Sequence, residues 1–384
     1  CLNAVLGAGA RGGAIGWIFN HKKTGKEMSK MMKAILFVGS VALAGFAQAA
    51  TLVWTGGGAD DNFSTPENWD PVQAPATGDS LTFAGETRTT PYNDLDPDKF
   101  TFANITFTND GSSGKNAAFT LSGNTLKLSG SIKGAQGSGG SLTETFDLEV
   151  AFTKATTIGG TADNMSTHHF TFNKKVSAPS NVTLSTTTQH KSKITFNGPI
   201  EGFDGFYRPN GSASIYINGV CSGFATAGFD FNEGSLYIVD ASNVGTAKSF
   251  RSGQGGYATA GVLYVTPTND VVLALNLKTC CPAQSNTGLT LRNKTAGKLV
   301  TFTGTVSEGG TKGNAGTSLV VSGDGDGRLS GEFKTDRMAF TKNGTGTWTL
   351  GAEIPSCAMT GLVTVAAGTL CVDYAVPTYK VSVA

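Results

Sequence analysis

The chain has 384 residues, of which 52 are glycine and only 15 % are charged, with a formal net charge of +1. An average soluble domain has roughly 7 % glycine and roughly 25 % charged residues, so this composition argues against helices that expose a charged face. The apolar residues are mostly β-branched or aromatic, and they alternate with Thr, Ser and Asn. This pattern predicts an all-β chain.

The segment 28–49 has the features of a secretory signal peptide. Lys30 and Lys33 precede an apolar run, and Ala47 and Ala49 supply the small side chains that signal peptidase requires. The run is shorter than the roughly 20 residues that span a bilayer, so it does not predict a membrane anchor. We expect cleavage near Ala49 and an exported, secreted or cell-surface chain that has no integral membrane segment.

The segment 1–27 lacks an initiating Met and contains a Gly/Ala-rich stretch that Arg11 interrupts. We interpret it as an extension of the gene prediction upstream of the signal peptide. Removing residues 1–49 removes six basic residues and one acidic residue, which leaves a net charge of −4. A mildly acidic chain without a Lys/Arg cluster lacks the electrostatic footprint of a nucleic-acid-binding protein, so we expect no nucleic-acid partner.

Two short patterns recur along the chain. The first, apolar-x-apolar-x-Gly-x-apolar, starts at Leu126 (LKLSGSI), Ile194 (ITFNGPI) and Val300 (VTFTGTV), with an echo, RLSGEF, at Arg328. Apolar residues at every second position predict a strand with one buried face, and the Gly predicts a turn at its end.

The second pattern, Gly-x-Leu-x-apolar, occurs at Gly234, Gly261 and Gly368. The interval from Gly261 to Gly368 is close to four times the interval from Gly234 to Gly261. A repeat with the length of the shorter interval predicts a solenoid, in which each rung covers the apolar surface of its neighbour and the end rungs need caps. We expect the Gly and Asn residues at the rung corners to occupy turn positions with positive φ.

Residues 330–372 resemble the autotransporter-associated β-strand repeat. The matching positions are Lys342, Gly344, Gly346-Thr347-Trp348-Thr349-Leu350, Thr360-Gly361, Thr364-Val365 and Gly368-Thr369-Leu370. The stretch EIPSCAMTG departs from the Asn-Thr-Tyr-like step of that repeat, and residues 218–243 look like a more diverged copy. The resemblance implies a right-handed parallel β-helix in a surface or secreted passenger region.

Residues 50–100 are expected to form an N-terminal β cap, and residues 101–384 the β-helix. The stretch WTGGGADDNFSTPENWD, which starts at Trp54, resembles the leader of such repeat proteins. Pro71 and Pro75 would discourage further edge pairing. Its large aromatic side chains are expected to cover the apolar end of the first rung: Trp54, Phe63 and Trp69.

A sugar-binding site is the alternative interpretation of the same stretch. Trp54 or Trp69 would then serve as a stacking platform, and Asp60, Asp61 and Asn62 would bond sugar hydroxyls. A capped Gly-Asp turn contains the same residue types, so we favour the cap.

Three other groups of side chains could hold a metal. Two are carboxylate clusters with calcium-like spacing: Asp94, Asp96 and Asp98, and then Asp324 and Asp326. Neither completes the ligand set of an EF-hand loop, so we interpret both as solvated turns. His168 and His169 are neighbours on a predicted strand, where they point to opposite faces, and we expect both to be partly exposed. No metal or cofactor is therefore expected.

Five cysteines follow the signal peptide: Cys221, Cys280, Cys281, Cys357 and Cys371. Export permits disulfides, but the odd number leaves at least one thiol unpaired. We hypothesise a bridge between Cys357 and Cys371, because these residues flank one predicted turn.

No Gly-x-Ser-x-Gly elbow, His-Glu-x-x-His motif or phosphate-binding loop occurs in the chain, and no catalytic residue is predicted. We therefore expect a non-enzymatic, adhesin-like structural β-helix that contacts cell-surface or extracellular glycans or proteins through extended area; the sequence identifies no ligand-binding residue. The alternative is a carbohydrate-binding or carbohydrate-cleaving β-helix. An outer groove lined by acids and aromatics from several rungs would favour that alternative, whereas a Thr/Asn/Ser face would favour the scaffold.

Overall fold

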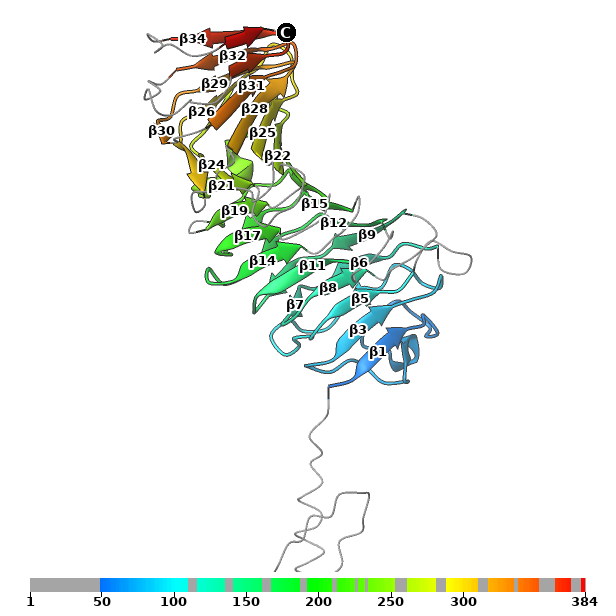
Figure 1. The fold of residues 1–384 in the computed structure, drawn as a ribbon. Helices are drawn as coiled ribbons and strands as arrows, with labels where there is room; N and C mark the ends of the chain where they lie inside the picture. The colour runs from blue at the N-terminus through cyan, green and yellow to red at the C-terminus, as the bar shows by residue number, and fades with distance from the viewer. Residues whose placement is uncertain are drawn as a thin grey trace, which may run out of the picture. The chain divides into compact units, whose positions relative to one another are not determined.

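The computed structural model describes residues 49–109, 116–134, 141–160, 167–186, 192–208, 213–224, 227–231, 234–252, 261–280, 288–309, 317–334, 338–351, 363–373 and 381–383. In these ranges the regular secondary structure consists of β-strands and of two short 3₁₀ helices, η1 (Pro66–Asn68) and η2 (Ala241–Asn243). The strands form a parallel β-solenoid of about 10 turns (Figure 1). The predictions of an all-β chain and of a solenoid are confirmed.

Two large sheets form two faces of the solenoid. Sheet A contains, in order across the sheet, β2 (Trp69–Asp70), β1 (Thr51–Trp54), β3 (Ser80–Phe83), β5 (Ile105–Phe107), β8 (Ile132–Gly134), β11 (Thr156–Gly160), β14 (Thr183–Thr186), β17 (Gly205–Arg208), β19 (Gly228–Phe231), β21 (Ser249–Ser252), β24 (Asn276–Cys280), β27 (Val306–Gly309) and β30 (Phe333–Lys334). Sheet B contains β4 (Tyr92–Asn93), β6 (Thr120–Gly123), β9 (Ser141–Asp147), β12 (Thr167–Phe172), β15 (Lys193–Phe196), β18 (Ser214–Ile217), β20 (Ser235–Ile238), β22 (Gly261–Val265), β25 (Gly288–Asn293), β28 (Thr317–Gly323), β31 (Met338–Lys342), β33 (Val363–Val365) and β35 (Val381–Val383).

A third face consists of two shorter sheets. One contains β7 (Leu126–Leu128), β10 (Val150–Phe152), β13 (Val176–Ser177) and β16 (Ile200–Glu201), and the other contains β23 (Val271–Leu273), β26 (Leu299–Phe302), β29 (Asp326–Leu329), β32 (Thr347–Leu350) and β34 (Thr369–Val372). Between these sheets, Cys221 forms an isolated bridge with Ile200, and the next rung carries η2.

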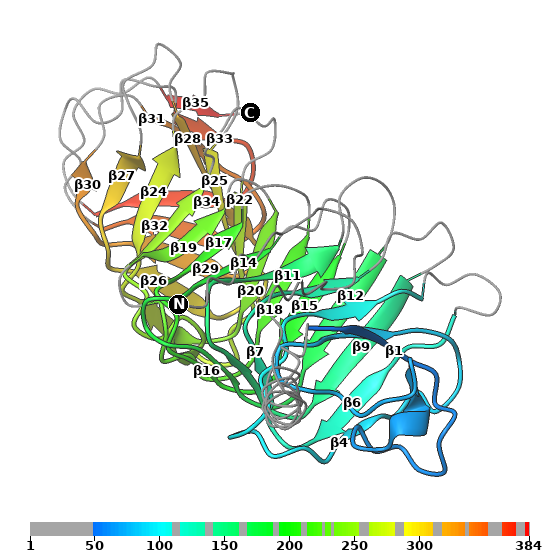
Figure 2. The ribbon, with the colours of Figure 1, turned by 90° about the horizontal axis from the view of Figure 1, so that it is seen from below.

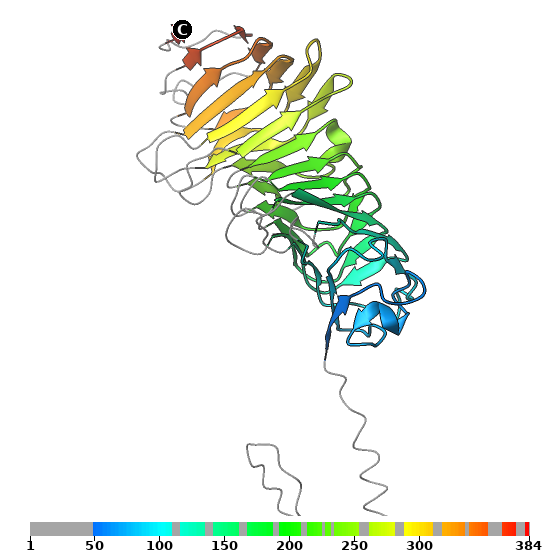
Figure 3. The same ribbon diagram turned by 90° about the vertical axis from the view of Figure 1, so that its right-hand side faces the viewer.

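From β6 to β17 and from β22 to β30, each rung passes from sheet B through the third face to sheet A. For example, β9, β10 and β11 form one rung, and β12, β13 and β14 form the next. Figures 1 and 2 both show β12 beside β9 and β14 beside β11. The strands of successive rungs run in the same direction (Figure 3). Residues far apart in the chain therefore form continuous columns along each face.

The rungs differ in length. In sheet A, the interval in sequence between the paired residues Phe229 and Phe250 is shorter than that between Leu277 and Val306. The predicted period is confirmed for β20 and β22, which are neighbours in sheet B. The third copy of the Gly-x-Leu-x-apolar pattern, however, is β34, which lies on the third face and not in sheet B. The prediction that all three copies follow one regular period was therefore wrong. Apolar residues alternate in the strands of every face, so the pattern does not tell which face a strand belongs to.

The core is built from the inward side chains of all three faces. In β3, for example, Leu81 and Phe83 are buried while Thr82 between them is not. Phe146, Phe172 and Phe196 follow one another on sheet B, and their rings stack with centroids 4.7 and 5.2 Å apart. Each such burial contributes about 1.5–3 kcal/mol, so the alternating pattern supplies the main driving force for stacking.

The glycine of the first repeated pattern lies at a corner of the rung in all four copies. A Cβ atom at Gly130, Gly198 or Gly304 would lie 2.3, 2.2 and 2.2 Å, respectively, from a backbone carbonyl oxygen of the preceding rung, and at Gly331 only 1.8 Å from the oxygen of Gly304. None of these four glycines has a positive φ. The expectation of positive φ is confirmed at Gly234 and Gly368 of the second pattern, where φ is +94° and +72°. It was wrong for the four corners of the first pattern, where glycine is required because neighbouring backbones stack in close contact.

We predict that Gly331→Ala lowers the free energy of unfolding by about 2 kcal/mol, because the added methyl group overlaps the backbone of the rung below. Gly297→Ala is the matched control: its φ is +71° but no atom lies within 4 Å of its added Cβ, so only the cost of the left-handed conformation, about 1 kcal/mol, is expected. Urea unfolding followed by circular dichroism measures both. Equal losses would contradict the stacking explanation.

Candidate functional site

The aromatic residues of the N-terminal stretch are packed inside the solenoid. Trp54 on β1 and Trp69 on β2 meet edge to face at 5.0 Å, and Phe63 meets Trp69 at 5.5 Å. All three contact Phe83 of β3. Because both indoles are only 1 % exposed, neither offers a ring face to a sugar, and the stacking platform considered above is absent from this conformation.

The strand β2 lies at the outer edge of sheet A, next to β1. It pairs antiparallel with β1, placing Trp69 opposite Trp54, whereas β1 and β3 pair in parallel. The Trp69 Nε1–H donates to the carbonyl oxygen of Phe63 at 2.8 Å, and the Trp54 Nε1–H donates to that of Arg88 at 3.0 Å. These contacts are compatible with the predicted cap.

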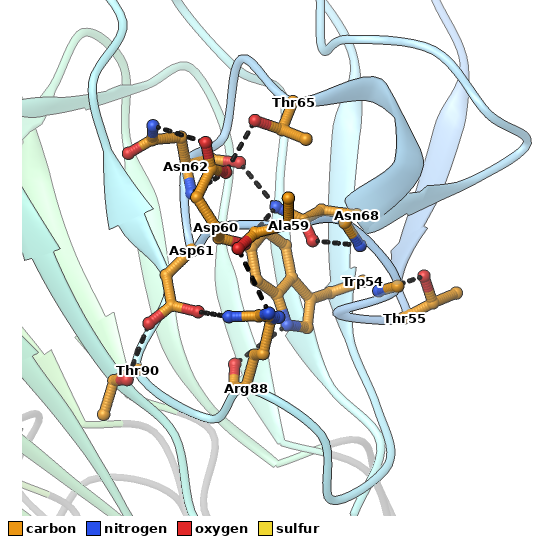
Figure 4. Close-up of polar contacts among 12 residues, drawn as sticks. Trp54, Thr55, Ala59, Asp60, Asp61, Asn62, Thr65, Asn68, Arg88 and Thr90 are labelled. Carbon is orange, nitrogen blue, oxygen red and sulfur yellow. Dashed lines mark hydrogen bonds and ion pairs between the residues drawn. The ribbon is translucent and has the colours of Figure 1, made fainter.

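The polar residues of the same stretch bond mainly to one another (Figure 4). The Asp60 carboxylate accepts hydrogen bonds from Thr65 Oγ1 at 2.6 Å and from the Asn62 backbone N–H at 3.1 Å. These bonds, that of Thr65 first, lower the pKa of Asp60. The Asn68 side chain donates to the carbonyl oxygens of Asp60 and Asn62, both at 3.0 Å. The arrangement closes the loop rather than presenting free groups to a ligand.

Asp61 also has protein partners. Its carboxylate lies 2.9 Å from Arg88 Nη1 and accepts a hydrogen bond from Thr90 Oγ1 at 3.3 Å (Figure 4). Arg88 donates in addition to the carbonyl oxygen of Ala59 at 3.3 Å. The acidic residues considered for sugar binding are thus engaged in holding the loop against the segment around Arg88.

The two carboxylate clusters do not converge on a common point. Asp94 accepts from the Ser64 backbone, Asp96 pairs with Lys99 at 3.1 Å, and Asp98 pairs with Lys127 at 3.1 Å. Asp324 accepts from Thr345 Oγ1, and Asp326 accepts from the Thr347 backbone. Within the described ranges no three His, Cys, Asp or Glu side chains lie close enough to hold a metal ion.

His168 and His169 point to opposite faces of β12, as expected, but they are not both partly exposed. His169 is half-buried and accepts a hydrogen bond from the Lys193 backbone N–H at 2.9 Å. His168 is buried, with its Nδ1 3.6 Å from Oε1 of the fully buried Glu144. The expectation for His168 was wrong because it is in phase with Phe170 and Phe172, which face the core; that alternation was visible in the sequence.

The Glu144–His168 pair is incompletely hydrogen-bonded. Glu144 Oε2 accepts from the Phe119 backbone N–H at 2.7 Å. Glu144 Oε1 and both ring nitrogens of His168 have no hydrogen-bond partner among the described residues. The imidazole fits because Gly134 lies beneath it, where a Cβ would be 2.4 Å from the ring. Each of these two buried polar groups therefore has the other as its nearest polar side chain.

Three tyrosines that the sequence analysis did not single out form a ladder on the outer face of sheet B. Tyr216, Tyr237 and Tyr264 are paired across β18, β20 and β22. Their ring centroids are 4.2 and 4.3 Å apart, and the rings are parallel to within 7° and 1°. The repeated phrases SIYI, SLYI and GVLYV were the signal available in the sequence.

Basic side chains lie against both ends of this tyrosine ladder. Lys193 Nζ is 4.5 Å from the Tyr216 ring centroid, and at the other end Arg292 Cζ and Lys294 Nζ are 5.6 and 5.7 Å from that of Tyr264. Cations attract the negative face of an aromatic ring, so these contacts stabilise the ends of the stack.

The ladder predicts a loss of stability in alkali. Burial, with smaller contributions from Tyr216 and Tyr264, raises the pKa of Tyr237 from 10.0 to about 12. The unfolded chain therefore releases this proton first, and the contribution of Tyr237 to stability is present below pH 10 and lost as the pH rises to about 12. Urea midpoints of Tyr237→Phe are expected to fall less over this interval than those of the unmodified protein. Parallel curves would contradict the assignment.

Residues 330–372, called the repeat-like segment below, include the residues that build one corner of a rung. Lys342 is buried, and its Nζ donates to the carbonyl oxygens of Asn343, Gly344 and Ala367 at 2.9, 2.8 and 3.0 Å. Burial lowers the pKa of Lys342. A Cβ at Gly368 would lie 2.6 Å from this Nζ. The Lys and Gly positions of the motif thus have a structural role; Thr360 and Gly361 lie outside the described residues.

The cysteines show no bridge within the described ranges. Cys371 has a free thiol, which counts against the hypothesised pair, and Cys357 lies outside the described residues together with Cys281. Cys221 is buried, and burial raises the pKa of its thiol to about 11, which makes it a poor nucleophile.

Comparison of the chain with protein-family models, with curated proteins and with solved structures found no match. None of the described segments is a helix with the length and apolar character needed to cross a membrane. The solenoid architecture is therefore known from the structure, and the relation to autotransporter-associated repeats rests on the residues of the repeat-like segment alone.

Proposed function

We propose that this protein is exported and acts as a structural, adhesin-like scaffold at the cell surface or in the medium. The signal-peptide features of residues 28–49 support export, and the parallel β-solenoid fits the right-handed β-helix that the repeat resemblance implies. The observation that carries the scaffold role is the outer surface itself. Columns of polar residues continue across consecutive rungs, as in the series Asn173, Asn197 and Asn218, whose side-chain amides are hydrogen-bonded at 2.9 Å.

A carbohydrate-binding role is the second candidate, and the tyrosine ladder favours it because that ladder places aromatic residues from three consecutive rungs on one face. A carbohydrate-cleaving role has less support. Glycoside hydrolysis requires two carboxylates on either side of the scissile bond. Among the described residues, the acids considered as candidates are held by protein partners, as at Asp61 and Asp98.

Incubation of the purified protein with neutral and acidic polysaccharides separates these roles. Retention of the polysaccharides on immobilised protein and the appearance of new reducing ends or unsaturated ends would be measured in the same samples. We expect retention of at least one polysaccharide with no new ends above the buffer control. Cleavage that follows protein concentration would contradict the scaffold proposal.

A further inference from the structure

We infer that the outer face of sheet B between β15 and β25 binds an extended anionic polysaccharide through the tyrosine ladder and the basic side chains at its ends. This inference rests on the proposed export, because it names the class of extracellular partner that the scaffold would meet. It replaces the stacking site considered at Trp54 and Trp69 by a site of different chemistry on another part of the solenoid.

The charge on this face is of one sign. The strands of sheet B from β12 to β31 contain no Asp or Glu, and their outward charged side chains are basic or His. Arg292 Nε donates to Ser322 Oγ at 3.2 Å, and no ion pair joins Lys193, Arg292 or Lys294 to a described carboxylate. The strands themselves therefore set no carboxylate against a polyanion, and the exposed acids Asp240 and Asp324 lie beyond the ends of β20 and β28.

The third face differs in this respect. Lys175 lies 3.5 Å from Glu149 and 3.9 Å from Glu201, and Arg328 lies 2.6 Å from Asp373. These two cations are paired with carboxylates of other rungs. Since the chain after residue 49 carries a net charge of −4, the uniformly basic strip on sheet B is a local departure from the charge of the whole.

The spacing of the cations favours a polymer over a small anion. Lys193 on β15 and Arg292 on β25 are separated by four strand intervals, which corresponds to about 19 Å at about 4.8 Å per interval. One small anion cannot contact both, whereas a chain lying across the strands can. Between the cations, the half-buried tyrosines and the neighbouring Ser214 and Ser235 provide hydroxyl groups at every rung.

The stacked rings argue against two other ligands. Single-stranded nucleic acids and neutral sugars gain much of their binding from stacking on free aromatic faces. In the ladder, the faces of Tyr237 are covered by Tyr216 and Tyr264, and the end rings have cations against them. Ring edges remain at the surface, and the Tyr237 hydroxyl group is hydrogen-bonded to Tyr216 and Ser214, so recognition of a ligand depends mainly on charge. This is the chemistry of a carboxylated glycan.

The test measures binding of the purified exported chain to immobilised polygalacturonate, with neutral dextran as the comparison polymer. The variant Lys193→Gln/Arg292→Gln/Lys294→Gln removes the three cations. We expect affinity for polygalacturonate to fall about tenfold or more, and added salt to weaken binding of the unmodified protein. The matched control, Lys133→Gln/Lys154→Gln/Lys248→Gln, removes the same charge from exposed positions elsewhere, and we expect its affinity to change by less than about twofold.

Three results would overturn the inference: equal losses in the two triple variants, equal affinity for dextran, or tighter binding of polyglutamate or a single-stranded oligonucleotide than of polygalacturonate.

Circular dichroism of each variant verifies the fold, and Tyr237→Phe, which keeps the stack but removes the central hydroxyl, provides a milder change that should also weaken binding. Failure of this inference leaves the proposed export intact, since export is measured on the native cell. Conversely, a protein that is retained inside the cell would contradict the proposed function, whereas the measured binding of polygalacturonate would still be valid.

Discussion

Replacing Trp69 by Ala is expected to lower the free energy of unfolding by about 3–5 kcal/mol. The indole is 1 % exposed and packs against Trp54, Phe63 and Phe83 at the end of sheet A, so its removal leaves a cavity in the first rung. It also removes the hydrogen bond from Trp69 Nε1 to the carbonyl oxygen of Phe63, which then lies in an apolar environment without this donor.

Guanidinium unfolding followed by far-UV circular dichroism measures this loss, and hydrogen exchange locates it. Because each rung of a solenoid contacts only its neighbours, we expect the amides of β1 and β3 to lose protection first. Val72→Ala is the control: Val72 is 69 % exposed, and a change within about 0.5 kcal/mol is expected. A loss below about 1 kcal/mol for Trp69→Ala would mean that the aromatic cluster does not stabilise the end of the solenoid.

The second large effect is expected at the buried Glu144–His168 pair. His168→Phe should cost about 3–5 kcal/mol, although it places an apolar ring on an apolar face, because it leaves the fully buried carboxylate without the imidazole 3.6 Å away. Glu144→Gln keeps an acceptor for the Phe119 backbone N–H while replacing the carboxyl group by a neutral amide. The double variant is therefore expected to be at least about 2 kcal/mol more stable than His168→Phe alone.

A double-mutant cycle from urea unfolding measures the coupling between the two residues. Strictly additive effects of Glu144→Gln and His168→Phe would show that the pair does not interact. The pair at Asp98 and Lys127, 3.1 Å apart but with an exposed carboxylate, provides the surface comparison, for which coupling of less than about 1 kcal/mol is expected.

The fold was predictable for two reasons. Alternating apolar residues indicate which side chains of a strand enter the core, and recurring sequence patterns indicate rungs that stack on one another. The phrase at Val300 has its strand and its corner glycine where the pattern placed them. Rung length was less predictable. Insertions at the corners change the interval in sequence between paired residues of sheet A, as the pairs of β19 with β21 and of β24 with β27 show, without changing the pattern within any strand.

The tyrosine ladder on sheet B was hard to predict for the same reason, which is the variation in rung length. The interval in sequence from Tyr216 to Tyr237 is shorter than that from Tyr237 to Tyr264, so their stacking depends on two different rung lengths. Lys193 and Arg292 meet the ladder from strands that lie far apart in the sequence. The burial of Glu144 and His168 could have been predicted, because both residues alternate in phase with phenylalanines of the core. Their environment could not, because Gly134, which leaves room for the imidazole, lies on a third strand.

Export is the step on which the proposed role depends most directly, and the intact mass of the native product tests it. The product would be isolated separately from the medium, the cell envelope and the cytoplasm. The proposal predicts that the protein outside the cytoplasm begins at Ala50 and lacks the segment 1–49. A product found only in the cytoplasm with residues 28–49 still attached would contradict export, and with it the role of the solenoid as an extracellular scaffold.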